Sequence, residues 1–150
     1  MKVRSRLILK GITLLEVLLS VTIISVLAGL SVPVLSTEVQ KNDFASSRMM
    51  LVQMLRRGET LSRAVENDSM WGVYATSDQL VLFQGTSYAA RVVAQDEVYK
   101  LPSSVGVSAT VEVNFSKLTG YPVATKTITL TSETESSATV SINERGTVSF

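Results

Sequence analysis

Residues 11–35 read GITLLEVLLSVTIISVLAGLSVPVL, and this stretch decides the expected fold. From Ile12 to Leu35 the run is 24 residues long and almost continuously apolar. A helix of this length can cross a hydrocarbon core of about 30 Å. Its polar interruptions are mostly Ser and Thr, whose hydroxyl groups can bond back to their own helix. The stretch therefore predicts a transmembrane helix over residues 12–35.

The charges around this helix are distributed unevenly. No acidic residue precedes it, but four basic residues do, namely Lys2, Arg4, Arg6 and Lys10. Basic residues favour the cytoplasmic side, so we expect a single-pass protein of the cytoplasmic (inner) membrane with a cytoplasmic N-terminus. An ordinary secretory signal cut near Ala28-Gly29-Leu30-Ser31 and a plain membrane anchor are the alternatives. Neither explains the carboxylate of Glu16 within the apolar run.

Glu16 is the last residue of a short sequence motif. Residues 11–16 read Gly-Ile-Thr-Leu-Leu-Glu, directly after the basic segment. In this string and its setting the chain resembles the type IV pilin and pseudopilin superfamily. The resemblance implies that residues 1–11 are a cleaved prepilin leader and that a prepilin peptidase cuts between Gly11 and Ile12. It also implies that the same enzyme methylates the new amino group of Ile12.

In a filament, the charge of Glu16 could have a partner on a neighbouring subunit. A charge inside an apolar helix costs roughly 2–3 kcal/mol near the bilayer centre, so it usually has a partner. In a filament, Glu16 of one subunit can meet the terminal amine of Ile12 of a neighbour, and a wrong register leaves both charges unpaired. Solvation of Glu16 among lipid headgroups is the alternative. Pro33 lacks an N–H group, so we expect a kink there.

Residues 36–66 keep a helical period with one apolar stripe, which predicts an amphipathic continuation of the helix packed on a sheet. The stripe consists of Phe44, Leu51, Leu55, Gly58, Ser62 and Val65. We interpret Gly58 as a point of close helix–sheet packing. On the other faces, we expect Arg56, Arg57 and Arg63 to pair locally with Glu59 and Glu66 rather than to bind DNA.

The remaining residues, 67–150, predict a β-rich globular domain. Turn formers at 67–69 end the helical pattern, and alternating segments follow. The predicted strands are 72–76, 80–84, 88–93, 107–115, 125–131, 139–142 and 147–150. The last two are joined by the loop 143–146, with Gly146 available for a positive φ. The predicted fold class is α+β, with a long N-terminal transmembrane and assembly helix packed against an antiparallel sheet, as in pilins.

Three strings of the β-rich part add a looser resemblance. Trp71-Gly72-Val73-Tyr74, Phe83-Gln84-Gly85 and the terminal segment 146–150 look similar to the GspH/FimT group of minor pseudopilins. This likeness follows the order of the elements more than any strict motif.

Composition excludes several kinds of chemistry. The chain has no His and no Cys, which removes Ser-His-Asp and Cys-His catalysis and imidazole metal sites. The close acidic pairs, Asp96-Glu97 and Glu133/Glu135, lack the ordered oxygen-rich loop that calcium requires. We therefore expect no enzyme activity, no cofactor and no metal site.

These observations predict a structural minor pseudopilin or pilin subunit of a type II secretion pseudopilus or a type IV pilus-like filament. The expected partners are the prepilin peptidase, other pilin or pseudopilin subunits, an inner-membrane assembly platform, and membrane lipid before assembly. After assembly the protein would form part of a periplasmic or extracellular filament. The alternative is a DNA-uptake or adhesive minor pilin that binds its ligand through the β domain. A convergent basic patch of Arg91, Lys100, Lys117, Lys126 and Arg145 would favour that alternative.

Overall fold

A computed structural model describes residues 11–132 and 137–150 of the chain, and for residues 30–36 it describes the backbone alone. The four leader charges and the acidic pair Glu133 and Glu135 lie outside the described residues. The chain forms two compact units, Met1–Ser36 and Thr37–Phe150.

One long helix belongs to both units. Helix α1 runs from Leu14 to Arg63 and contains 50 residues. It has Glu16 in its first turn and Arg63 in its last. Both charges oppose the partial charges of the helix ends, which stabilises the termini. The helix is continuous through residue 33, whose side chain is not described, so the kink at Pro33 stays a prediction.

The predicted transmembrane segment requires a correction. Within the described part of the chain, no helix combines the length and the apolar character needed to cross a bilayer. The transmembrane part of the predicted fold class and the single-pass localisation in the cytoplasmic membrane are therefore wrong.

The first sheet, sheet A, is antiparallel and has the strand order β3-β2-β1-β5. Its strands are Trp71–Ala75 (β1), Gln79–Gln84 (β2), Glu97–Lys100 (β3) and Val111–Phe115 (β5). The predicted hairpin of β1 and β2 is confirmed: the Thr76 N–H donates to the Gln79 carbonyl at 2.9 Å across the turn.

The second sheet, sheet B, is also antiparallel and has the order β4-β6-β7-β8. Its strands are Val105–Val107 (β4), Lys126–Ser132 (β6), Ala138–Ile142 (β7) and Val148–Ser149 (β8). The predicted closing hairpin is confirmed. Gly146 adopts a φ of 82°, and the Asn143 N–H donates to the Thr147 carbonyl at 3.2 Å.

Two sheets replace the single sheet of the predicted fold class. The segment predicted as one strand, 107–115, is interrupted after Val107 and resumes at Val111, so its halves join different sheets. The predicted strand 88–93 is also wrong. That segment forms two short 3₁₀ turns, Tyr88–Ala90 (η2) and Val93–Gln95 (η3), and the strand β3 follows where none was predicted.

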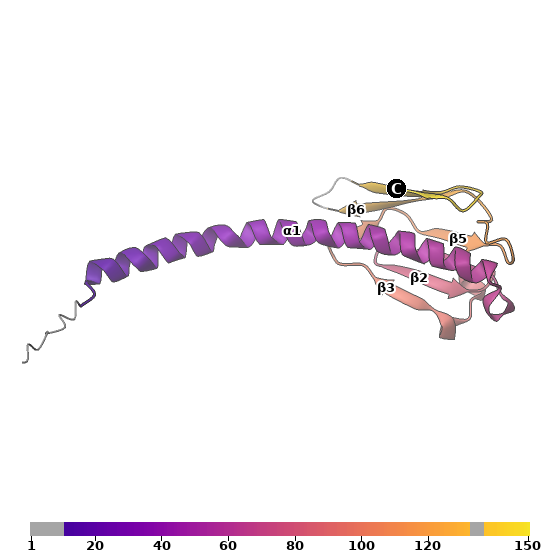
Figure 1. Cartoon of the computed structure of the whole chain (residues 1–150), viewed down its shortest axis with the longest axis horizontal. Coiled ribbons are helices and arrows are strands. Elements are labelled where there is room, and N and C mark those ends of the chain that lie inside the picture. The colour runs from indigo at the N-terminus through magenta and orange to yellow at the C-terminus, as the bar shows by residue number, and fades with distance from the viewer. Residues whose placement is uncertain (1–10, 133–136) are drawn as a thin grey trace, which may run out of the picture. The chain divides into compact units, whose positions relative to one another are not determined.

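The core of the second unit is one hydrophobic cluster shared by α1 and both sheets. Figure 1 shows the C-terminal part of α1 running alongside β2, β3, β5 and β6. In β1, alternate residues point to the helix, so Trp71, Val73 and Ala75 are all buried in this cluster. From α1 the cluster receives Phe44, Leu51, Val52, Met54 and Leu55.

Two small residues let α1 approach sheet A closely. A Cβ atom on Gly58 would lie 3.0 Å from Cε2 of Phe115 and 3.3 Å from Cδ1 of Leu82, which confirms the predicted close packing. One turn later, the buried hydroxyl of Ser62 accepts a hydrogen bond from the Trp71 N–H at 2.9 Å. This bond ties the end of the helix to the first strand.

Candidate functional site

The predicted processing site lies at the start of α1. Gly11, Ile12 and Thr13 precede the helix in non-helical conformation, and all three are exposed. Thr13 caps the helix. The Glu16 N–H donates to its hydroxyl at 3.2 Å, and the Val17 N–H donates to its carbonyl at 3.2 Å. The Gly11–Ile12 bond is thus accessible and lies immediately before an ordered helix terminus.

Glu16 occupies the third position of this helix, three residues after the capping threonine. The spacing Thr-x-x-Glu is that of a capping box, in which each residue can satisfy a backbone N–H of the other. The negative charge also lies in the first turn, where the helix dipole favours it. Glu16 therefore has a local role in its own chain, which the sequence reasoning missed although the spacing signals it.

The surface of α1 from Leu14 to Gly29 is mostly apolar, and every residue of this segment is exposed. Its hydroxyl groups point back to the helix, as expected: Ser20 Oγ donates to the Glu16 carbonyl at 2.7 Å, and Ser25 Oγ donates to the Val21 carbonyl at 2.8 Å. Large apolar side chains remain in solvent, with Leu14 80% and Leu15 75% exposed. A surface of this size on a protein usually has an interaction partner.

The basic residues proposed as a DNA-binding patch are partly neutralised. Arg91 forms an ion pair with Asp96 at 2.7 Å, and Lys117 forms one with Asp68 at 2.5 Å. The hydrogen bond that Arg91 donates to the Asp96 carboxylate raises the pKa of the guanidinium above its usual value. Arg91 also lies 3.8 Å from the centroid of the Tyr88 ring. Its charge is thus engaged within the domain.

The arginines of α1 form ion pairs as well. Arg63 pairs with Glu59 on the same helix at 2.5 Å, as predicted. Arg57 pairs with Glu97 of β3 at 2.7 Å instead of with a helical neighbour. Both arginines are about half exposed, so the pairs add little stability, but they balance the charge of this face.

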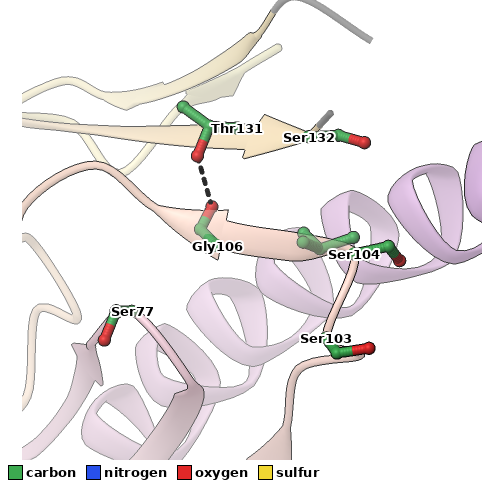
Figure 2. Close-up of a pocket in the computed structure, with 7 residues that line it drawn as sticks. Ser77, Ser103, Ser104, Gly106, Thr131 and Ser132 are labelled. Carbon is green, nitrogen blue, oxygen red and sulfur yellow. Dashed lines mark hydrogen bonds between the residues drawn. The ribbon is translucent and has the colours of Figure 1, made fainter. Parts of the chain in front are cut away.

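A shallow pocket of about 390 Å³ lies between the β1–β2 turn and β4 (Figure 2). The hydroxyl groups around it come from Ser77, Ser103, Ser104, Thr131 and Ser132. Thr131 Oγ1 donates to the Gly106 carbonyl at 3.4 Å. None of the residues described as lining this pocket is charged or aromatic, so none of them can act as a general base for a serine hydroxyl.

Metal ligation receives no support from the described acidic residues. Within residues 11–132 and 137–150, no three acidic side chains come together as a metal site would require. In the first acidic pair, Asp96 and Glu97 bind different arginines, Arg91 and Arg57.

No family model, no curated protein and no solved structure matches the chain. The assignment of a function therefore depends on the residues of the chain itself.

Proposed function

We propose that this chain is a structural subunit of a filament of the type IV pilin or pseudopilin kind, matured by a prepilin peptidase. In this proposal the peptidase cuts between Gly11 and Ile12 and methylates the new amine. The freed helix then packs among the corresponding helices of neighbouring subunits on an assembly platform. The unit 37–150 is carried on the filament as a folded domain.

A single observation carries the proposal: the Gly11–Ile12 junction precedes a helix whose first part, residues 14–29, is mostly apolar and exposed. The second unit has a hydrophobic core of its own, built from α1 and both sheets. Burying the exposed apolar surface of residues 14–29 against other helices would be favourable, at about 25 cal/mol per Å². An association driven by helix packing therefore suits this segment better than catalysis or ligand binding.

Glu16 gives such packing its register. After cleavage, the terminal amine of Ile12 carries a positive charge. In an apolar bundle of helices, the carboxylate of a neighbour's Glu16 neutralises that charge. Misaligned helices would bury both charges without partners, and this cost disfavours every other axial alignment of neighbouring helices. The leading version is a minor pseudopilin of a secretion filament.

The proposal is tested by looking for the chain in filaments. In cells that carry a complete assembly system, filaments sheared from the surface and purified should contain the protein, detected with antibodies against residues 37–150. Deleting the peptidase should remove it from that fraction. If the protein is absent from purified filaments of peptidase-positive cells, the proposed function is wrong.

A further inference from the structure

Strand β3 is the open edge of sheet A, and Figure 1 shows it as the outermost strand beside β2. The opposite edge strand, β5, is partly covered by its own chain. The Val123 N–H donates to the Asn114 carbonyl at 2.8 Å, and Phe115 forms a bridge with Pro122. In the described part of the chain, β3 pairs with β2 alone. An open edge is a template for a further strand.

The hydrogen bonds between β2 and β3 determine which backbone groups of β3 point outward. The Leu101 N–H donates to the Asp78 carbonyl at 2.8 Å, so these residues form a hydrogen-bonded pair of the ladder. Such pairs alternate along an antiparallel ladder, so Tyr99 also bonds to β2, whereas the N–H and C=O groups of Val98 and Lys100 point away from it. None of the described residues donates a hydrogen bond to these outward groups or accepts one from them.

The sequence of this edge is complementary in charge to itself. Residues 96–100 read Asp-Glu-Val-Tyr-Lys, and Asp96 continues the strand with an extended backbone, at φ −68° and ψ 128°. When a second copy pairs antiparallel with Val98 opposite Val98, each Lys100 lies opposite the Asp96 of the other copy. Unlike charges directly opposite each other stabilise a strand pair, whereas like charges destabilise it.

The same register matches the outward backbone groups. Val98 lies on the two-fold axis, so its N–H can donate to the Val98 carbonyl of the second copy, and the reverse bond follows by symmetry. The Lys100 N–H faces the Asp96 carbonyl of the second copy, and no described residue donates to that carbonyl within the chain. A shift of one residue would place outward groups opposite groups that already bond to β2. The charges and the hydrogen bonds therefore select one register.

The side chains of this edge have unused capacity for such a contact. Val98 is 53% exposed, and a second Val98 opposite it would cover part of its apolar surface. Lys100 forms no ion pair within the described part of the chain. Asp96 binds Arg91 through Oδ2, while its Oδ1 has no hydrogen-bond partner among the described residues. A lysine on an edge usually repels other edges, but in this register it meets an acidic residue.

We propose that two copies of this chain associate through β3, with Val98 on the two-fold axis and sheet A continued across the pair. This axis is perpendicular to the sheet, so the part of α1 that packs along sheet A runs in opposite directions in the two copies. Subunits related by the helical symmetry of a filament instead share one direction. The paired form is therefore a state outside the filament, and the inference goes beyond the proposed function without depending on it.

The substitution Val98→Cys tests the pairing in the full chain, which has no cysteine of its own. Opposed residues of a hydrogen-bonded strand pair have Cα atoms about 5.5 Å apart, which a disulfide can bridge. The full-length variant, purified in a detergent that covers the apolar segment 14–29 and treated with the mild oxidant diamide, should give a covalent dimer on a non-reducing gel. Val123→Cys, at a side chain that is 65% exposed beside β5, should stay monomeric.

A charge reversal separates specific pairing from random collision. In the Val98→Cys background, Lys100→Glu places a carboxylate opposite Asp96 in both symmetric pairs, so the yield of covalent dimer should fall about tenfold. Lys126→Glu makes the same change at an exposed site on β6 and should leave the yield unchanged. Both variants should keep the thermal midpoint, followed by the fluorescence of the buried Trp71.

The inference is overturned if Val98→Cys gives no more covalent dimer than Val123→Cys, or if Lys100→Glu and Lys126→Glu lower the yield equally. In cells that assemble filaments, the covalent Val98→Cys dimer should be found outside the filament fraction. Covalent dimer inside filaments would contradict the opposite helix directions. If the wild-type protein never enters filaments, the proposed function fails, and the crosslinking of the purified chain still decides whether the pairing exists.

Discussion

Replacing Glu16 with leucine should exclude the chain from filaments and leave its cleavage intact. On the proposed function, the peptidase reads mainly the Gly11–Ile12 junction, which lies outside α1 and does not involve the Glu16 side chain. Within a filament, the substitution leaves the amine of a neighbour's Ile12 buried and unpaired. Removing one partner of a buried ion pair costs about 3–5 kcal/mol. Since about 1.4 kcal/mol is tenfold, incorporation should fall by orders of magnitude.

Glu16→Gln distinguishes the two roles of this residue. Glutamine suits the same position of a capping box that begins at Thr13, but it carries no charge. If the charge sets the register, both variants should show a similarly low ratio of filament-bound to unassembled mature protein. If glutamine restores the wild-type ratio, Glu16 acts only as a helix cap and the register mechanism must be abandoned. A wild-type ratio for leucine would exclude both roles.

Replacing Phe115 with alanine should have the largest effect on the stability of the domain. Its side chain is fully buried, and its ring lies against Gly58 of α1. The glycine cannot fill the vacated space, because it has no side chain. We expect the free energy of unfolding to fall by about 3–5 kcal/mol, as for other buried Phe-to-Ala substitutions. Urea unfolding followed by circular dichroism measures this change.

Phe150→Ala provides the same chemical change at a different site. Phe150 is 57% exposed, and its described contact is with the guanidinium of Arg48, 5.6 Å from the ring centroid. Its loss should cost less than about 1 kcal/mol. Equal destabilisation by the two variants would contradict the packing described for Phe115.

The parts of the fold that local pattern decides were predicted correctly. The apolar stripe from Phe44 to Ser62 and the hairpins β1–β2 and β7–β8 follow from periodicity and turn chemistry. The predicted last member of the stripe, Val65, is wrong, because α1 ends at Arg63 and Val65 has a φ of 57°. The segment 88–93 has strand-like composition, yet tertiary contacts override it: Tyr88 stacks on Tyr74 at a ring distance of 3.7 Å. An aromatic stack between segments distant in sequence leaves no periodic signal.

The two-sheet arrangement was missed for a similar reason. Residues 107–115 alternate well enough to suggest one strand, and nothing local marks the break that sends β4 and β5 to different sheets. The membrane-spanning assignment is contradicted, because no helix in the described part of the chain is long and apolar enough to cross a membrane.

The sequence predicts the candidate processing residues Gly11 and Ile12, but the sequence analysis did not identify every residue that shapes their surroundings. The capping role of Thr13 could have been predicted, because Thr-x-x-Glu before an apolar run is a recognised signal for the start of a helix. The conformation of the loop between β5 and β6 could not be predicted, because Leu118-Thr119-Gly120 is typical of an ordinary turn. Its distinguishing features, the positive φ of Leu118 and the anchor to Ser62, arise only when the loop meets the end of α1.

The intact mass of the chain recovered from purified filaments tests the central claim most directly. Cleavage after Gly11 predicts a protein that begins at Ile12 and carries one methyl group on its terminal amine. The variant Gly11→Val should remain uncut and absent from the filament fraction, because a side chain before the scissile bond blocks close approach of the backbone to the peptidase. Filament-bound protein that retains residues 1–11, or that begins near Ala28, would contradict the account.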